Sequence, residues 1–149
     1  MIINNVIKIH KILLTFLIIG ITVSCKTDIK EIIEEKYPDD SPKLIRFYKE
    51  KNGEKEIVKE ISFYPNHNKK IEGEYKNNKR HGKWTAWFED GKIQSEGYFK
   101  NGLNHGSRKV YYENGNKRYE GKYENGKYIG KWKFYSPDGN LINEINFDK

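Results

Sequence analysis

Four glutamates recur at a constant spacing and are the first candidates for chemistry in this sequence: Glu72, Glu96, Glu120 and Glu144. Two carboxyl groups about 6.5–9.5 Å apart are what an inverting glycoside hydrolase requires. A catalytic acid and base, however, need different pKa values, and residues repeated at equivalent positions have equivalent environments. We therefore expect these glutamates to pair across strands with Lys122, Lys131 or Lys133. An enzyme that acts on polysaccharide is the weaker alternative.

Two histidines, His81 and His105, are separated by the same spacing as the glutamates. If each repeated unit contains two strands, their side chains lie about 9.5 Å apart, because neighbouring strands are spaced by about 4.8 Å. Ligands of one zinc ion must each approach it to about 2 Å, and the third unit has Ile129 at this position. No glycine-rich loop precedes a helix to bind phosphate. We therefore predict no catalytic residue, no metal site and no cofactor.

The single cysteine, Cys25, follows an apolar run from Ile12 to Val23 that is preceded by Lys8 and Lys11. Twelve residues of helix span only about 18 Å, less than the roughly 30 Å of a bilayer core, so the run predicts a signal peptide over residues 1–24. The stretch "ITVSC" resembles the lipobox of bacterial lipoproteins, although Thr22 stands where that motif usually has an aliphatic residue. The resemblance implies that Cys25 is lipidated and anchors the mature protein in the bacterial cell envelope, in the outer membrane of a Gram-negative cell. A signal peptide with a chance cysteine is the alternative.

A repeated unit, which extends from each of these glutamates to the next, explains most of the remaining sequence. The unit that starts at Glu72 matches the unit that starts at Glu120 at ten of 24 positions, far more than chance allows. Each unit contains two turn signals, such as Asn125-Gly126 and Asp138-Gly139, and such dipeptides close tight hairpins. Two turns in each unit predict two antiparallel strands in each unit.

Alternation within the strands assigns side chains to two faces. In "KWKFY", Trp132 and Phe134 face one way, and Lys131, Lys133 and Tyr135 face the other, which is the period of a strand. Each hairpin therefore has an aromatic side and a charged side. A glycine inside a strand lets a large ring approach the backbone closely. We predict that the recurring tryptophans pack over the recurring glycines, namely Trp84 and Trp132 over Gly73, Gly97 and Gly121.

These hairpin units resemble the bacterial variant of the MORN repeat, the membrane occupation and recognition nexus module. The resemblance covers roughly residues 43–149 and is carried by glycines and aromatic residues in phase: Gly73, Tyr75, Gly82, Trp84, Gly97, Phe99, Gly106, Gly121, Tyr123, Gly130 and Trp132. Arg108 departs from the tryptophan column and Ile145 from the glycine column. The resemblance implies an all-β fold, an elongated, curled single-layer antiparallel sheet of stacked β-hairpins. It implies no single activity, because such repeats serve as protein-binding surfaces, lipid-associated scaffolds or antitoxins.

The segment before the repeats has two interpretations. Asp28 and Glu31 fit a helix-capping pair, and Ile29, Ile32 and Ile33 share one helical face, so residues 25–42 are either a short helix to about Lys36 or a flexible tether. A shortened first unit is expected over residues 43–71. The predicted organisation is therefore a signal peptide (1–24), a tether or helix (25–42) and a repeat domain (43–149).

The function that we predict is binding. Net charge falls from +7 to +5 when Lys8 and Lys11 leave with the signal, a mild excess that does not indicate nucleic-acid binding. We expect an unknown protein partner, or another envelope macromolecule, to bind a surface that contains Trp87, Tyr111, Tyr135, Lys109 and Lys133. The alternative is an antitoxin or immunity protein that neutralises one cognate toxin.

Overall fold

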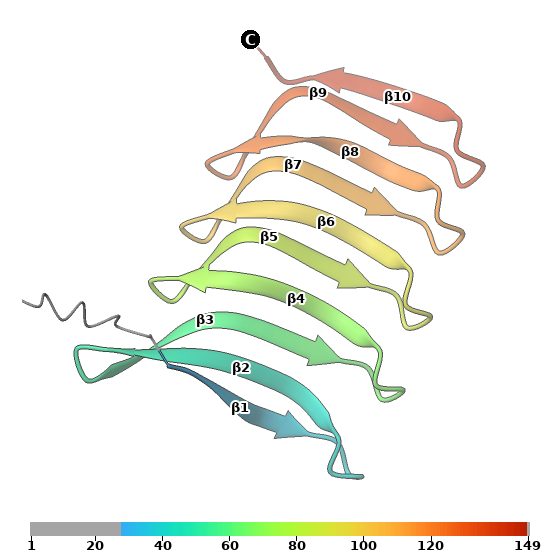
Figure 1. The fold of residues 1–149 in the computed structure, drawn as a ribbon. Coiled ribbons are helices and arrows are strands. Elements are labelled where there is room, and N and C mark those ends of the chain that lie inside the picture. The colour runs from blue at the N-terminus through green and yellow to red at the C-terminus, as the bar shows by residue number, and fades with distance from the viewer. Residues whose placement is uncertain (1–27, 149) are drawn as a thin grey trace, which may run out of the picture.

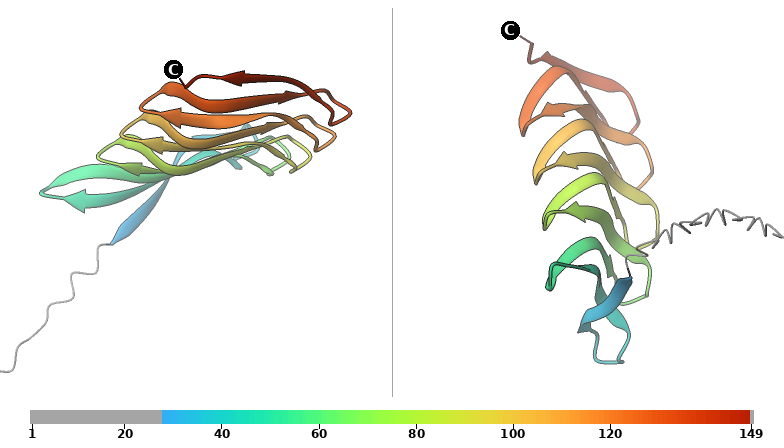
Figure 2. Two further views of the ribbon diagram at one scale, coloured as in Figure 1. Left: turned by 90° about the horizontal axis from the view of Figure 1, so that it is seen from above. Right: turned by 60° about the vertical axis from the view of Figure 1, so that its left-hand side comes forward.

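The chain forms a single antiparallel sheet of ten strands whose spatial order follows their order in the sequence (Figure 1). A computed structural model describes residues 28–148. The strands are β1 (Ile29–Lys36), β2 (Pro42–Lys51), β3 (Glu54–Phe63), β4 (Lys69–Lys76), β5 (Lys79–Trp87), β6 (Ile93–Lys100), β7 (Leu103–Tyr111), β8 (Lys117–Glu124), β9 (Lys127–Tyr135) and β10 (Leu141–Asn146). Figure 2 shows one curved layer that does not close on itself. The predicted all-β sheet of hairpins is confirmed.

Two kinds of turn alternate along the sheet and have the backbone conformations that their residues favour. The short turn between β6 and β7 places Asn101 and Gly102 at φ angles of 53° and 87°, as Asn-Gly hairpins require. At the other end of the strands, the loop from Phe88 to Lys92 is closed by a backbone hydrogen bond of 2.8 Å between these two residues. Both turn types reverse the chain within a few residues, so consecutive strands become neighbours.

One face of the sheet, which we call the aromatic face, carries a row in which glycines alternate with large side chains. Along this row, Gly73 stands opposite Trp84, Trp84 opposite Gly97, and Gly97 opposite Arg108. The indole of Trp84 lies so close over Gly73 that a Cβ atom there would overlap the ring, and Trp132 covers Gly121 in the same way. The predicted packing is confirmed at these two glycines. Over Gly97 the prediction is wrong, because the Arg108 side chain lies there instead.

Two tryptophans are the most deeply buried hydrophobic residues of the described chain. Trp84 and Trp132 are 4% and 1% exposed, and Tyr75 and Tyr123 contact them edge-on, with ring centroids 5.3 and 4.9 Å away. Burying one such ring removes about 150–250 Å² from water, which contributes several kcal/mol. These rings therefore take the place of a second layer.

Strand β1 replaces the helix or tether that the sequence predicted between Asp28 and Lys36. The helix is wrong: these residues pair with β2, and Ile33 stands opposite Ile45. Isoleucine is β-branched and favours strands when a partner strand is available, and cross-strand contact outweighs a short helix that is marginal alone. No helix in residues 28–148 is long and apolar enough to cross a membrane.

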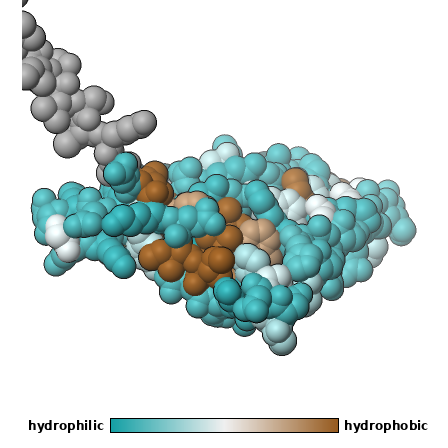
Figure 3. Space-filling model, turned by 60° about the horizontal axis from the view of Figure 1, so that its bottom comes forward, coloured by the Kyte–Doolittle hydropathy of each residue, from teal (hydrophilic) through white to brown (hydrophobic). Residues whose placement is uncertain are grey.

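The β1 end of the sheet carries exposed apolar side chains. Ile29 and Ile33 are 59% and 43% exposed, and Figure 3 shows apolar residues gathered at this end, while the surrounding surface is mostly hydrophilic. Ile61 continues the isoleucine row from β1 and β2 onto β3. From β4 onward the residues of this row are polar or charged, so only the first three strands have an apolar row at this place on the sheet.

The ring-on-glycine contact predicts unequal costs for two equivalent substitutions. Gly121→Ala places a methyl group inside the Trp132 ring and should lower the free energy of unfolding by about 1–3 kcal/mol or more. Gly97→Ala is the matched control, because its nearest neighbour is the flexible end of Arg108, at 2.9 Å, and it should cost clearly less. Urea unfolding of both variants measures the difference. Equal losses would show that the rings do not depend on the glycines.

Candidate functional site

The face opposite the aromatic face, which we call the charged face, carries a continuous row of side chains from neighbouring strands. It contains Ile61, Glu72, Thr85, Glu96, Lys109, Glu120, Lys133 and Glu144, each opposite the next. Glutamates come from the even-numbered strands β4 to β10, and their neighbours come from the odd-numbered strands. The repeat period therefore becomes a straight ladder of side chains across the sheet.

Lysines neutralise the glutamates of this ladder. Lys117 Nζ lies 2.9 Å from Glu120, and Lys131 Nζ lies 2.9 Å from Glu144. Glu72 and Glu96 form corresponding pairs with lysines. Each carboxylate thus has a cationic partner and a similar environment, which is the arrangement of structural ion pairs and not of an acid and base with separated pKa values.

The three lysines that the sequence named as partners have different roles. Lys131 pairs with Glu144, as predicted. Lys133 stands directly opposite Glu120 and Glu144, and Lys122 lies two residues after Glu120 on β8. Among residues 28–148, no salt bridge involves Lys109, Lys122 or Lys133. These three ammonium groups therefore leave an excess of positive charge around Glu120.

A hollow of about 500 Å³ lies on the charged face where these lysines gather, and its volume is in the ordinary range for ligand sites. We call it the lysine hollow. Its lining includes Ser107, Lys109, Glu120, Lys122, Lys131 and Lys133. Four lysines and one glutamate give it a positive potential, which attracts anionic groups. The sequence predicted Lys109 and Lys133 as residues of the binding surface. The register of β7, β8 and β9 shows that Lys122 and Lys131 lie beside them.

The predicted aromatic residues lie at the edge of the same face. A register irregularity precedes Trp87 and Tyr111 in their strands, and all three predicted aromatic residues are half-buried. Tyr135 Oη donates a hydrogen bond of 2.8 Å to Glu120, and Lys117 Nζ lies 5.3 Å from the Tyr135 ring centroid. The structure therefore brings Tyr135 together with Lys109 and Lys133 around Glu120. Trp87 and Tyr111 occupy the equivalent position in earlier units.

These contacts shift the pKa values of the ladder. Burial raises the pKa of the Glu120 carboxyl, but hydrogen bonds from Lys117 and Tyr135 outweigh it, so the pKa lies below the ordinary 4.5. The hydrogen bond to Glu120 raises the pKa of Tyr135. Glu120 is therefore ionised at neutral pH and holds Tyr135 in place.

The two candidate metal ligands do not form a metal site. Within the described part of the chain, no group of three or more His, Cys, Asp and Glu side chains is placed to hold a metal ion. The Nδ1 atoms of His81 and His105 are buried without a hydrogen-bond partner. Cys25, the predicted lipidation site, and the signal peptide lie outside the described residues.

Removing the phenol of Tyr135 should destabilise the sheet in a pH-dependent way. A lowered carboxyl pKa stabilises the folded state above its unfolded value of about 4.5, and this contribution is lost as pH falls through the folded-state pKa. Tyr135→Phe should therefore lower the free energy of unfolding by about 1 kcal/mol near neutral pH and by less at about pH 3. Urea unfolding at both pH values measures this, with Tyr111→Phe as the control one repeat earlier. A loss that does not change with pH would contradict the role assigned to Glu120.

Comparison with known proteins shows that part of the chain is similar to one family. Residues 80–101, 104–127 and 128–149 match the family described as MORN repeat variant, and no curated protein matches the chain. Each matched segment contains all but the first residue of one odd-numbered strand, the loop after it and the next even-numbered strand. The unmatched strands β1 to β4 continue the same sheet with the same antiparallel pairing. The three matched segments are therefore similar to MORN repeat variants.

Proposed function

We propose that this protein is a non-catalytic binding module, held at the bacterial envelope by a lipid on Cys25, whose charged face captures an anionic protein surface or another anionic envelope macromolecule. The lysine hollow is the observation that supports this proposal most directly. Its lysines outnumber the carboxylates in its lining, so the surplus positive charge attracts an external anionic group. Electrostatic complementarity of this kind speeds association and selects the partner.

The position of the aromatic residues supports the same proposal. Tyr135 is half-buried and fixed by its hydrogen bond to Glu120, so little conformational entropy is lost when a partner packs on it. Rigid aromatic residues beside charged groups are common at protein-binding hot spots. The repeat places one aromatic residue at the end of each of β5, β7 and β9. Such a row suits an extended partner surface more than a small molecule.

Replacing two surplus lysines should weaken partner capture without unfolding the protein. We expect the double variant Lys109→Gln, Lys133→Gln to recover at least about tenfold less partner from detergent-solubilised envelope, since both charges face the hollow. Mass spectrometry of the captured proteins identifies and quantifies the partner. The matched control is Lys55→Gln, Lys127→Gln, which removes the same charge from exposed positions at hairpin ends.

Three results would decide between the alternatives. Undiminished capture by the double variant would contradict the charged face as the binding surface. A variant with Trp87→Ala and Tyr111→Ala should also lose capture while its circular dichroism stays unchanged. Recovery of one toxin as the sole partner would assign the antitoxin or immunity function, which uses the same surface.

The lipid anchor is tested separately. If Cys25 is lipidated, cells grown with radioactive palmitate should label the protein, and Cys25→Ser should abolish the label and release the protein from the membrane fraction. Labelling that persists in Cys25→Ser would contradict the proposed anchor. The binding proposal would survive that result, because the lysine hollow lies far along the chain from residue 25.

A further inference from the structure

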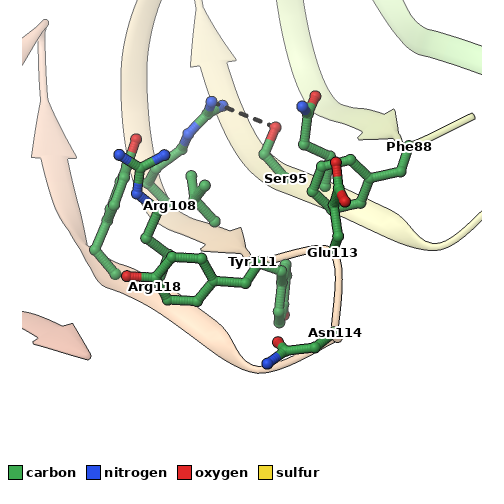
Figure 4. Close-up of a pocket in the computed structure, with 11 residues that line it drawn as sticks. Phe88, Ser95, Arg108, Tyr111, Glu113, Asn114 and Arg118 are labelled. Atoms are coloured by element: carbon green, nitrogen blue, oxygen red, sulfur yellow. Dashed lines mark hydrogen bonds between the residues drawn. The ribbon is translucent and has the colours of Figure 1, made fainter. Parts of the chain in front are cut away.

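Beyond the proposed function of the charged face, we propose that the opposite, aromatic face contains a second binding site: a hollow around Arg108 that binds a carboxylate side chain of an acidic protein segment. The hollow has a volume of about 550 Å³ and lies among β6, β7 and β8 (Figure 4). We call it the arginine hollow. Its lining includes Phe88, Ser95, Arg108, Val110, Tyr112 and Arg118.

The arginine hollow occurs where the repeat departs from its own pattern at three positions. Arg108 replaces the tryptophan of the two neighbouring units, Ser95 replaces the larger Ile71 and Tyr119, and Phe88 replaces Tyr64 and Tyr112. Arg108 has no indole ring, Ser95 has a smaller side chain, and Phe88 has no hydroxyl group. All three changes fall at one place on the sheet. Tyr64 and Tyr112 each donate a hydrogen bond to a backbone oxygen of the next unit, a bond that Phe88 has no hydroxyl to form. The three departures together open the space.

Arg108 is positioned by its neighbours but has donors left over. Its side chain lies over Gly97, where a Cβ atom would be 2.9 Å from one guanidinium nitrogen. Its other terminal nitrogen donates a long hydrogen bond of 3.4 Å to Ser95 Oγ (Figure 4). A guanidinium carries five N–H donors. The stem is thus fixed on the sheet, and most donors are available to a ligand.

The arginines around this site share a deficit of carboxylates. Arg118 lines the arginine hollow, and Arg80 lines an adjoining hollow of about 420 Å³ that shares Ser95 and Arg108 with it. In residues 28–148, none of these three arginines forms a salt bridge, and Glu113, the acidic residue in the lining, forms none either.

Arg46, in contrast, has a carboxylate partner within the chain. It lies in the same row of the sheet as Glu60 and is 2.9 Å from that carboxylate. Glu60 occupies the repeat position of Arg108 in the first unit. The aromatic face therefore pairs one arginine internally and leaves three near the hollow without a carboxylate.

Geometry favours a peptide carboxylate over a lone phosphate. Arg80 lies on β5 and Arg108 on β7, so the arginines around the hollow are spread over more than one strand. An acidic segment with several carboxylates can reach arginines spread in this way, whereas a single phosphate offers one anionic group. A guanidinium binds a carboxylate with two parallel hydrogen bonds, and Val110 and Tyr112 offer apolar walls to the side-chain stem.

A random dodecapeptide library selected on the full chain in detergent tests this site directly. Peptides enriched by the wild type should be richer in Asp and Glu than those enriched by Arg108→Trp, which introduces the residue found in the two neighbouring units and fills the hollow. For an enriched peptide, replacing its glutamate by glutamine should weaken binding about tenfold or more, as loss of a charge-assisted pair does. Arg108→Lys keeps the charge but loses the planar guanidinium that makes two parallel hydrogen bonds. It should also weaken binding.

The controls separate this site from the lysine hollow and from lipid. The same comparison of Arg108 with Arg108→Trp, made with Lys109→Gln and Lys133→Gln present in both proteins, should give the same acidic enrichment, because the contribution of the lysine hollow is then removed. Failure of the proposed function and failure of this site are therefore distinguishable. Thermal unfolding of each Arg108 variant confirms that it is folded. Identical peptides selected by the wild type and by Arg108→Trp, or no acidic enrichment, would overturn the proposal. So would Arg108-dependent binding to phosphatidylglycerol vesicles without binding to acidic peptides.

Discussion

The sheet depends on one contact: an indole ring lying flat on a strand that has no side chain beneath it. Trp84 over Gly73 and Trp132 over Gly121 achieve this in two units. Each indole nitrogen also donates a 3.1 Å hydrogen bond to a backbone oxygen, of Glu74 and of Lys122 respectively. Pairing is irregular next to these residues. The ring therefore buries apolar surface, and its N–H group donates a hydrogen bond to a backbone carbonyl beside the irregularity in strand pairing.

This constraint divides the roles of the two faces. On the aromatic face, the close approach of ring and backbone leaves little freedom in residue choice at the glycine row. The opposite face has no such contact, and its row changes from isoleucine on β1 to β3 into alternating glutamate and lysine or threonine further along. A single-layer sheet can therefore hold its fold with one face and vary its surface chemistry with the other.

Much of the fold was predictable because the repeat fixes both turns and strand alternation. The Asn-Gly turns, the constant repeat period and the tryptophan-on-glycine packing all follow from local residue types. Strand β1 was not predictable, because its isoleucines fit one face of a helix equally well. Only its pairing with Ile45 and neighbouring residues of β2 makes this segment a strand. For the site, sequence placed Lys109 and Lys133 on one face, but grouping them with Lys122 and Lys131 required the register. The arginine hollow was not predicted, since it arises from residues on three strands, none of which indicates a site by itself.

Stacked hairpins also explain how one unit can lose its tryptophan without loss of the fold. In such arrays each unit contacts only its neighbours, so the energetic cost of a departure stays local. Gly97 still faces Trp84 on one side, and on the other side its missing side chain leaves room for the stem of Arg108. The space that elsewhere accepts a ring thus accepts a cation, and the atom nearest to the Gly97 Cβ position is a guanidinium nitrogen of Arg108. In a repeat whose glycines leave room for large side chains, one unit can therefore carry a binding residue in place of a packing residue. The hairpins on either side keep the sheet together.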